Sequence, residues 1–300
     1  MLWKLPHVDI APSTIFYIPF TNLPVSNTLL CTWLSIAVLV VLFYLGTRRR
    51  DLIPRGAQNF TEWIVESLRG MVESVAGKER GKQFFPLVAT FFIFIFVSNL
   101  LDIFPGVDTV GAIDGQAIAA MHTTSRPVLG FLLFGDISNA IIPWIRPATT
   151  DLNLTFAMAI VSVVTCQVFG FVKLGAKEHL SKYINFKSPI DFVVGFLEIV
   201  SEIARIISFS FRLFGNIFAG STVLAVFAFI LPFLADIIFI PFEIFVAFVQ
   251  ALVFSLLTLV FLEIASTSHE HTETESEHKA REEYERNKEQ ELLATQVQRS

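Results

Sequence analysis

Long apolar runs, separated by short charged segments, dominate the first 265 residues of the chain. A helix that crosses the hydrocarbon core of a bilayer needs about 20 predominantly apolar residues. The runs predict five membrane spans, at residues 28–47, 84–101, 152–172, 189–231 and 237–264. The sequence therefore predicts an all-α integral membrane protein with a membrane domain over residues 28–265.

The fourth run is too long for a single perpendicular crossing. Its apolar part, Ile190–Leu231, would measure about 63 Å as a straight helix, against a hydrocarbon core of about 30 Å. We therefore expect this helix to be broken, strongly tilted or partly outside the core. Pro232 ends it, because proline cannot continue a helix. The prediction is a long, tilted penultimate helix that packs against the last helix.

Between the first two spans, residues 59–76 follow an amphipathic pattern. Apolar side chains recur at helical spacing on one face: Phe60, Trp63, Ile64, Leu68, Met71, Val72 and Val75. Asn59 followed by Glu62 resembles a capping box, which starts a helix. This segment is too short and too charged to span, so we expect an interfacial helix in the headgroup plane, with a soluble loop helix as the alternative.

Lysine and arginine residues predict the orientation of the chain. Three basic clusters adjoin the spans: Arg48, Arg49, Arg50 and Arg55; Lys78, Arg80 and Lys82; and Lys173, Lys177, Lys182 and Lys187. The long loop 102–150 contains only two basic residues of this kind, Arg126 and Arg146. Basic residues favour the cytoplasmic side, so five crossings place the N-terminal segment 1–27 outside and the C-terminal tail 266–300 in the cytoplasm.

Composition excludes an ordinary soluble protein. Hydrophobic residues make up 53% of the chain and charged residues 16%, whereas soluble domains carry about 25% charged residues. The tail 266–300 differs, with nine acidic and five basic residues, and is expected to be solvated. The sequence has no phosphate-binding loop, His-Glu-x-x-His motif or Gly-x-Ser-x-Gly motif. We therefore expect no ATP chemistry, metal site or catalytic nucleophile in this chain.

A line of polar side chains follows the fourth predicted span. At about 100° per residue, six of them fall within an arc of about 80°: Asp191, Glu198, Glu202, Arg205, Arg212 and Asn216. Ionisable groups at membrane depth are costly and often mark ion pathways. Glu202 and Arg205 are close enough in sequence to form a static pair, whereas Arg212 has no partner nearby in sequence. We expect another helix or another subunit to supply that partner.

The last predicted span carries a second polar line. Asp236, Glu243 and Gln250 are seven residues apart, so each is displaced from the previous one by only about 20°. Two adjacent helices with facing polar lines can enclose a hydrated path through hydrocarbon. The sequence thus predicts an ion path between the last two helices, with a static interhelix network as the alternative.

The stretch Ser210–Gly220 reads Ser-Phe-Arg-Leu-Phe-Gly-Asn-Ile-Phe-Ala-Gly. It resembles the signature of subunit a of F-type ATP synthases, the ATP synthase A chain family, in the penultimate membrane helix. Further pieces match that family in the same order: Asn99-Leu100-Leu101 with Pro105, Asp151 to Thr155, Leu197 to Ser201, Gln250-Ala251 and Leu257 to Leu262. The resemblance extends from Val25 to Ala265.

The resemblance implies a stator subunit against which a ring of c subunits rotates. Arg212 would be the essential arginine that couples proton translocation to this rotation. Two aqueous half-channels would use Glu198, Asn216, Glu243 and Gln250, with Asp151, Asn153 and Ser221 as further candidates. The implied partners are the c ring, b-type peripheral stalk subunits, other ATP synthase subunits and the lipid bilayer. No cofactor is implied, and the chain would be a non-catalytic part of the enzyme complex.

Two positions depart from the pattern of many bacterial members, which have a carboxylate directly after Ala-Gly and a histidine seven residues before the glutamine. Ser221 and Glu243 occupy these positions here, so we expect a single carboxylate and no histidine relay.

The main alternative function is that of a stand-alone ion-coupled secondary transporter. Such transporters usually contain internal repeats with broken helices in both halves, whereas the polar line occurs once in this sequence. A membrane enzyme and a structural scaffold are weaker alternatives. A proton is the expected ion and Na⁺ stays open. The expected location is a bacterial plasma membrane, with an organelle inner membrane as the second choice.

Overall fold

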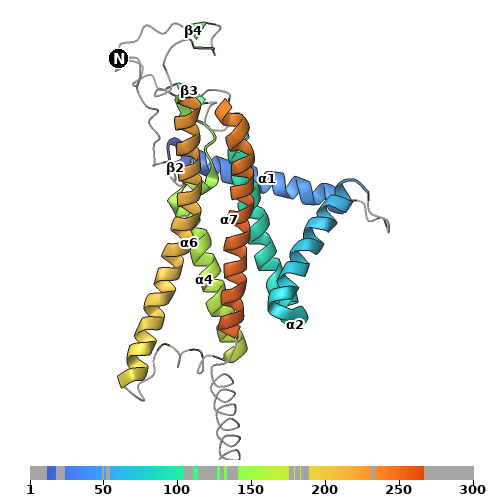
Figure 1. Cartoon of the computed structure of the whole chain (residues 1–300), viewed down its shortest axis with the longest axis vertical. Coiled ribbons are helices and arrows are strands. Elements are labelled where there is room, and N and C mark those ends of the chain that lie inside the picture. Colours follow the sequence, from blue (N-terminus) through green and yellow to red (C-terminus); the bar gives the residue numbers. More distant parts are fainter. Residues whose placement is uncertain are drawn as a thin grey trace, which may run out of the picture. The chain divides into compact units, whose positions relative to one another are not determined.

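The computed structural model describes residues 12–17, 24–48, 51, 55–104, 111–113, 127–128, 132–133, 141–175, 179, 183, 189–230 and 234–266. Five long helices dominate these residues (Figure 1): α1 Asn27–Thr47, α2 Ala57–Asp102, α4 Leu152–Leu174, α6 Pro189–Ile230 and α7 Leu234–Ser266. The chain divides into two compact units, one of residues 1–164 with 200–260 and one of residues 165–199 with 261–300. The predicted tail lies outside the described residues beyond Ser266.

Four of the described helices are long and apolar enough to cross a membrane: α1, α2, α4 and the part Ile237–Ser266 of α7. Their outward surfaces are apolar, as the exposed Val40 and Leu45 of α1 illustrate. In a soluble protein such helices would be unstable, whereas hydrocarbon accommodates them. The prediction of a helical integral membrane protein is therefore confirmed.

Helix α6 is one unbroken helix of 42 residues, about 63 Å long at the standard rise. A break in the helix was one of the three ways in which this long run was expected to fit a bilayer. No such break occurs within α6. The physical reason is that α6 contains no proline after Pro189. The helix ends at Ile230, just before Pro232, as predicted.

Helix α2 combines the predicted interfacial helix and the second predicted span in one element. The two were expected to be separated by the charged stretch 77–83, but only Gly77 leaves the helical conformation, with φ 74° and ψ 167°. Glycine adopts a positive φ without the steric cost that a side chain would add. The second arm therefore begins at Lys78, and the bend between the arms is visible in Figure 1.

The predicted apolar face of the first arm of α2 is only partly buried. The buried residues of this arm recur at helical spacing: Thr61, Leu68, Val72 and Ala76. At the start of this arm Thr61 meets α1, where Gly46 lies directly against its side chain. Phe60 and Trp63 belong to the predicted apolar face but are exposed and stacked on each other, with ring centroids 6.5 Å apart. The predicted apolar face is thus divided between buried side chains, such as Leu68 and Val72, and an exposed aromatic edge.

Short strands, which the sequence interpretation did not predict, occur outside the long helices. They form three antiparallel pairs: β1 Thr14–Tyr17 with β2 Pro24–Ser26, β3 Gly111–Ile113 with β6 Ile141–Pro143, and β4 Pro127–Val128 with β5 Leu132–Leu133. A 3₁₀ turn, η2 Ala148–Thr150, precedes α4. Each strand has two to four residues, which is too short for an alternating pattern to distinguish it from a loop.

Hydroxyl groups join the helices inside the first unit. Thr155 of α4 and Ser210 of α6 are hydrogen-bonded at 3.1 Å, and both side chains are fully buried. Ser162 of α4 meets Thr258 of α7 at 2.9 Å. These bonds satisfy polar groups that would be costly if left unpaired in an apolar environment, and they hold α4 against both α6 and α7.

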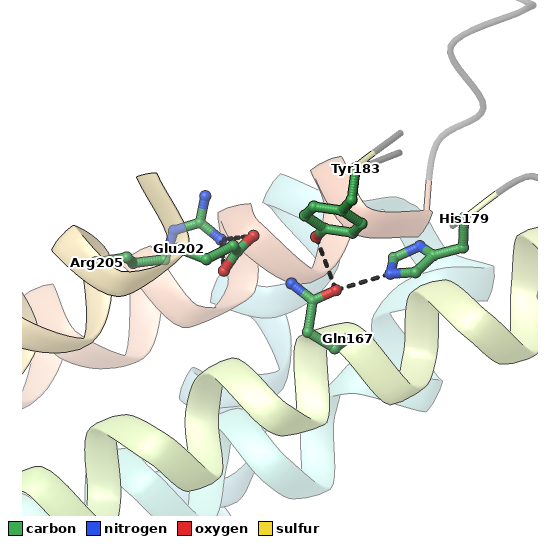
Figure 2. A network of polar contacts seen from close by, with 5 residues as sticks. All are labelled: Gln167, His179, Tyr183, Glu202 and Arg205. Carbon is green, nitrogen blue, oxygen red and sulfur yellow. Dashed lines mark hydrogen bonds and ion pairs between the residues drawn. The ribbon is translucent and has the colours of Figure 1, made fainter. Parts of the chain in front are cut away.

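The second unit contains its own polar cluster, drawn in Figure 2. The Tyr183 hydroxyl donates to Gln167 Oε1 at 2.9 Å, and His179 Nε2 lies 2.7 Å from the same oxygen. The His179 ring is buried and covers Gly170, where any Cβ would overlap it. Gly170 therefore allows His179 to pack closely on α4.

Candidate functional site

A cleft of about 240 Å³ lies between the end of α2 and the helices α6 and α7. Its polar lining residues are Asn99, Asp102, Asn216 and Glu243. The rest of the lining is mainly apolar, with Ile217, Val246 and Phe242 among its members. The cleft is roomy enough for several water molecules and offers them polar partners.

The sequence predicted Asn216 and Glu243 as path residues but missed Asn99 and Asp102 as part of the same site. Asn99 and Asp102 are three residues apart, which places them on one face of the last turn of α2. A charged residue at the end of an otherwise uncharged span was the available signal. It did not suffice, because only tertiary packing brings α2 to α6 and α7.

Glu243 of α7 lies against Gly220 of α6 in the cleft. A Cβ at Gly220 would be 3.2 Å from Glu243 Oε1, so the missing side chain makes room for the carboxylate. The neighbouring Ser221 donates its hydroxyl to the backbone oxygen of Phe218 at 3.1 Å. Ser221 is not among the residues that line the cleft.

An amide pair bridges α6 and α7 one helical turn before Gly220. Asn216 Nδ2 donates to Gln250 Oε1. Gln250 is buried, and its Nε2 has no hydrogen-bond partner among the described residues. The structure therefore pairs Gln250, one of the predicted path residues, with Asn216.

Arg212 lies on the exposed side of α6, one turn before Asn216. Its Nη2 donates to Ser208 Oγ at 3.4 Å, and its guanidinium carbon lies 5.9 Å from the centre of the Phe209 ring. Within the described part of the chain, it forms no ion pair with a carboxylate. The expectation that its partner comes from elsewhere is thus compatible with the geometry.

Glu202 and Arg205, by contrast, pair with each other. Arg205 Nη1 lies 2.9 and 3.0 Å from the two carboxylate oxygens of Glu202 (Figure 2). This is the static pair that the sequence suggested. Glu198 lies one turn earlier on α6 and is partly buried, and the side chain of Asp191 is not described.

Asp151 and Asn153 lie outside the cleft lining. The buried Asp151 accepts hydrogen bonds from Thr28 Oγ1 and from the backbone N–H of Asn153, both at 2.9 Å. It therefore caps the start of α4 and connects that helix to α1. Asn153 is exposed. The described residues contain no group of three or more His, Cys, Asp or Glu side chains that could hold a metal ion.

The fold and the site together define a multi-pass helical membrane protein with ionisable side chains gathered on two of its long helices. Comparison with known families identifies it further. The sequence profile of the family described as ATP synthase A chain matches residues 29–263, and the chain belongs to this family.

Curated relatives support the assignment over most of the chain. ATP synthase subunit a of Moorella thermoacetica is 30% identical over 262 residues, which cover 87% of this chain and 99% of the relative. ATP synthase subunit a of Geotalea uraniireducens is 34% identical over 236 residues, which cover 77% of this chain and 84% of the relative. ATP synthase subunit a 3 of Pelobacter propionicus is 33% identical over 234 residues, which also cover 77% of this chain and 84% of the relative. All three relatives are bacterial.

Proposed function

We propose that this chain is the stator subunit in the membrane sector of a rotary ATP synthase and couples proton flow to the rotation of a ring of c subunits. One observation carries the residue-level proposal: Arg212 is exposed on α6 and unpaired with any described carboxylate, next to the amide pair and the polar cleft. Membership of the ATP synthase A chain family supports the stator role and implies other ATP synthase subunits as partners.

Arg212 acts as a fixed positive charge. A guanidinium stays protonated at any accessible pH, so it attracts a carboxylate on a passing ring subunit and favours its ionised form. Because it neither releases nor accepts a proton, it also blocks direct passage between two access paths. Each ring carboxylate must then release its proton to one side and reload from the other after nearly a full turn, which couples ion flow to rotation.

The cleft serves as the outer half-channel. Water in it connects Glu243 to the surface, and a carboxylate in a hydrated, partly apolar cleft can relay protons. Asn216 and Gln250 extend the polar lining toward Arg212. Glu198, on the other side of Arg212 along α6, belongs to the inner half-channel. Asp151, Asn153 and Ser221 have weaker geometric support, because they lie outside the cleft lining.

The proposed placement follows the basic clusters of the sequence. The segment 1–27 and the loop 102–150 are outside, and the tail 266–300 is in the cytoplasm. With α6 as the fourth of five crossings, a tilt lets its length fit the bilayer. The exposed face of α6 meets the c ring, and b-type stalk subunits hold the chain still. The bacterial relatives favour a plasma membrane.

The test is ATP-driven acidification of sealed vesicles that contain the whole assembled complex with Arg212→Ala. The matched control is the double variant Glu202→Ala/Arg205→Ala. It removes an arginine from the same helix together with the carboxylate that pairs with it, so no unpaired charge is left. We expect pumping to vanish in Arg212→Ala and to persist in the double variant, with both complexes assembled. Normal pumping by Arg212→Ala would refute the proposal and favour the secondary transporter.

A further inference from the structure

An aromatic column connects three helices beneath Arg212. The Phe91 ring of α2 meets the Phe254 ring of α7 edge to face, with centroids 5.3 Å apart, and Phe254 meets Phe209 of α6 at 5.0 Å. Their exposed fractions are 8%, 2% and 2%. Each ring is held by its neighbour, so the position of the Phe209 ring is set by the packing of α2, α6 and α7 together.

The guanidinium of Arg212 lies over the last ring of this column. Its central carbon is 5.9 Å from the centre of the Phe209 ring, within the range of a cation–π interaction. Side chains of an α-helix lean toward its N-terminus, so a residue at position i+3 covers the one at position i. The same lean brings Arg212 Nη2 to Ser208 Oγ.

We propose that Phe209 is a positioning residue for Arg212. The face of the Phe209 ring holds the guanidinium group against the exposed side of α6. The inference rests on the proposed role of Arg212 in ion coupling. Phe209 does not touch the transported ion. It acts through the arginine, by reducing the number of positions that the long side chain would otherwise sample.

A neutral ring suits this task better than a carboxylate would. The five N–H donors of a guanidinium lie in its plane, whereas a cation–π contact uses its face. Phe209 can therefore hold the group while leaving its charge and most of its donors available to a carboxylate on another subunit. An ion pair within the chain, such as that of Arg205 with Glu202, uses the donors and offsets the charge.

The test replaces Phe209, in the assembled complex, with phenylalanines that carry one, two and three ring fluorines. Fluorine nearly preserves the size of the ring but withdraws electron density from its face, which weakens the attraction for a cation. The readout is the rate of ATP-driven vesicle acidification per assembled complex. We expect the rate to fall stepwise with each fluorine, about two- to five-fold over the series, as the strength of an exposed cation–π contact implies.

The matched control is the same series at Phe254, which packs on Phe209 but has no cation–π contact within the described part of the chain. A merely structural role would give equal slopes at the two positions, and this outcome would overturn the inference. A flat series at Phe209 would overturn it as well. Arg212→Ala in the same assay separates the two proposals: if that variant pumps, the stator function fails, and if it does not, a flat series refutes only the role of Phe209.

Discussion

Replacing Gly46 by alanine should destabilise the contact between α1 and the first arm of α2. A methyl group at Gly46 would lie 2.5 Å from Thr61 Cγ2 and 2.9 Å from Thr61 Cβ, whereas carbon atoms in contact are normally about 3.5–4.0 Å apart. The Thr61 side chain is buried and hydrogen-bonded to Ala57 O at 3.1 Å and to Gln58 O at 3.0 Å. It cannot move aside without losing these bonds, so the helices themselves must separate.

Two opposing terms decide the sign of the effect. Alanine stabilises a helix interior by about 1 kcal/mol relative to glycine, and overpacking a close contact costs about 1–3 kcal/mol. The net expectation for Gly46→Ala is a loss of up to about 2 kcal/mol. Gly70 on α2 is the matched control, because a Cβ there meets nothing within 4 Å. Gly70→Ala should therefore stabilise the protein by about 1 kcal/mol.

The assay is the thermal midpoint at which the detergent-solubilised complex loses this subunit. We expect a lower midpoint for Gly46→Ala and a higher one for Gly70→Ala. Adding Thr61→Ala to Gly46→Ala removes Oγ1 and Cγ2 and should recover most of the loss, although Cβ remains close. An increase for Gly46→Ala equal to that for Gly70→Ala would show that α1 and α2 are not in such close contact, and the reasoning would fail.

Two further predictions concern the cleft and the amide pair. Asn216→Ala and Gln250→Ala should each slow ATP-driven acidification. The double variant should be no slower than the slower single variant, because both changes remove the same hydrogen bond. Additive losses in the double variant would contradict this. Glu243→Gln should slow acidification by about tenfold or more, because an amide cannot relay a proton as a carboxylate does. Ser221→Ala should leave it nearly unchanged, because the Ser221 hydroxyl is bonded to a backbone oxygen outside the cleft lining. A large effect of Ser221→Ala would place that hydroxyl in the proton path.

The positions of the long helices could be predicted closely because charged residues and turns separate the apolar runs. The predicted spans 28–47 and 152–172 became α1 Asn27–Thr47 and α4 Leu152–Leu174. The connection inside α2 was harder, because the charged residues after Gly77 suit a loop and a helix equally. Only the backbone conformation of Gly77 shows that the helix bends there and continues.

The candidate site could be predicted in part, along single helices but not across them. Helical periodicity identified the ionisable residues of α6 and α7 and the pair Glu202–Arg205. It could not show that Asp102 joins the cleft, since that depends on how α2 packs. Nor could it distinguish a path residue from a helix cap, which is the position that the structure gives to Asp151.

The order of groups along α6 is compatible with the two roles proposed for this chain, a fixed cation at Arg212 and a proton relay at Glu243. Arg212, Asn216 and Gly220 follow one another at intervals of four residues, so Glu243, which lies against Gly220, is about 12 Å from Arg212 along the helix axis. At an effective dielectric constant of about 20, two charges at 12 Å attract by about 1.4 kcal/mol, against about 4 kcal/mol at 4 Å. The lean of Arg212 toward Phe209 increases the separation further. The neutral Asn216–Gln250 pair lies between the two groups. In the proposed mechanism this separation lets Glu243 exchange protons independently of Arg212, whose charge is left for a carboxylate outside the chain.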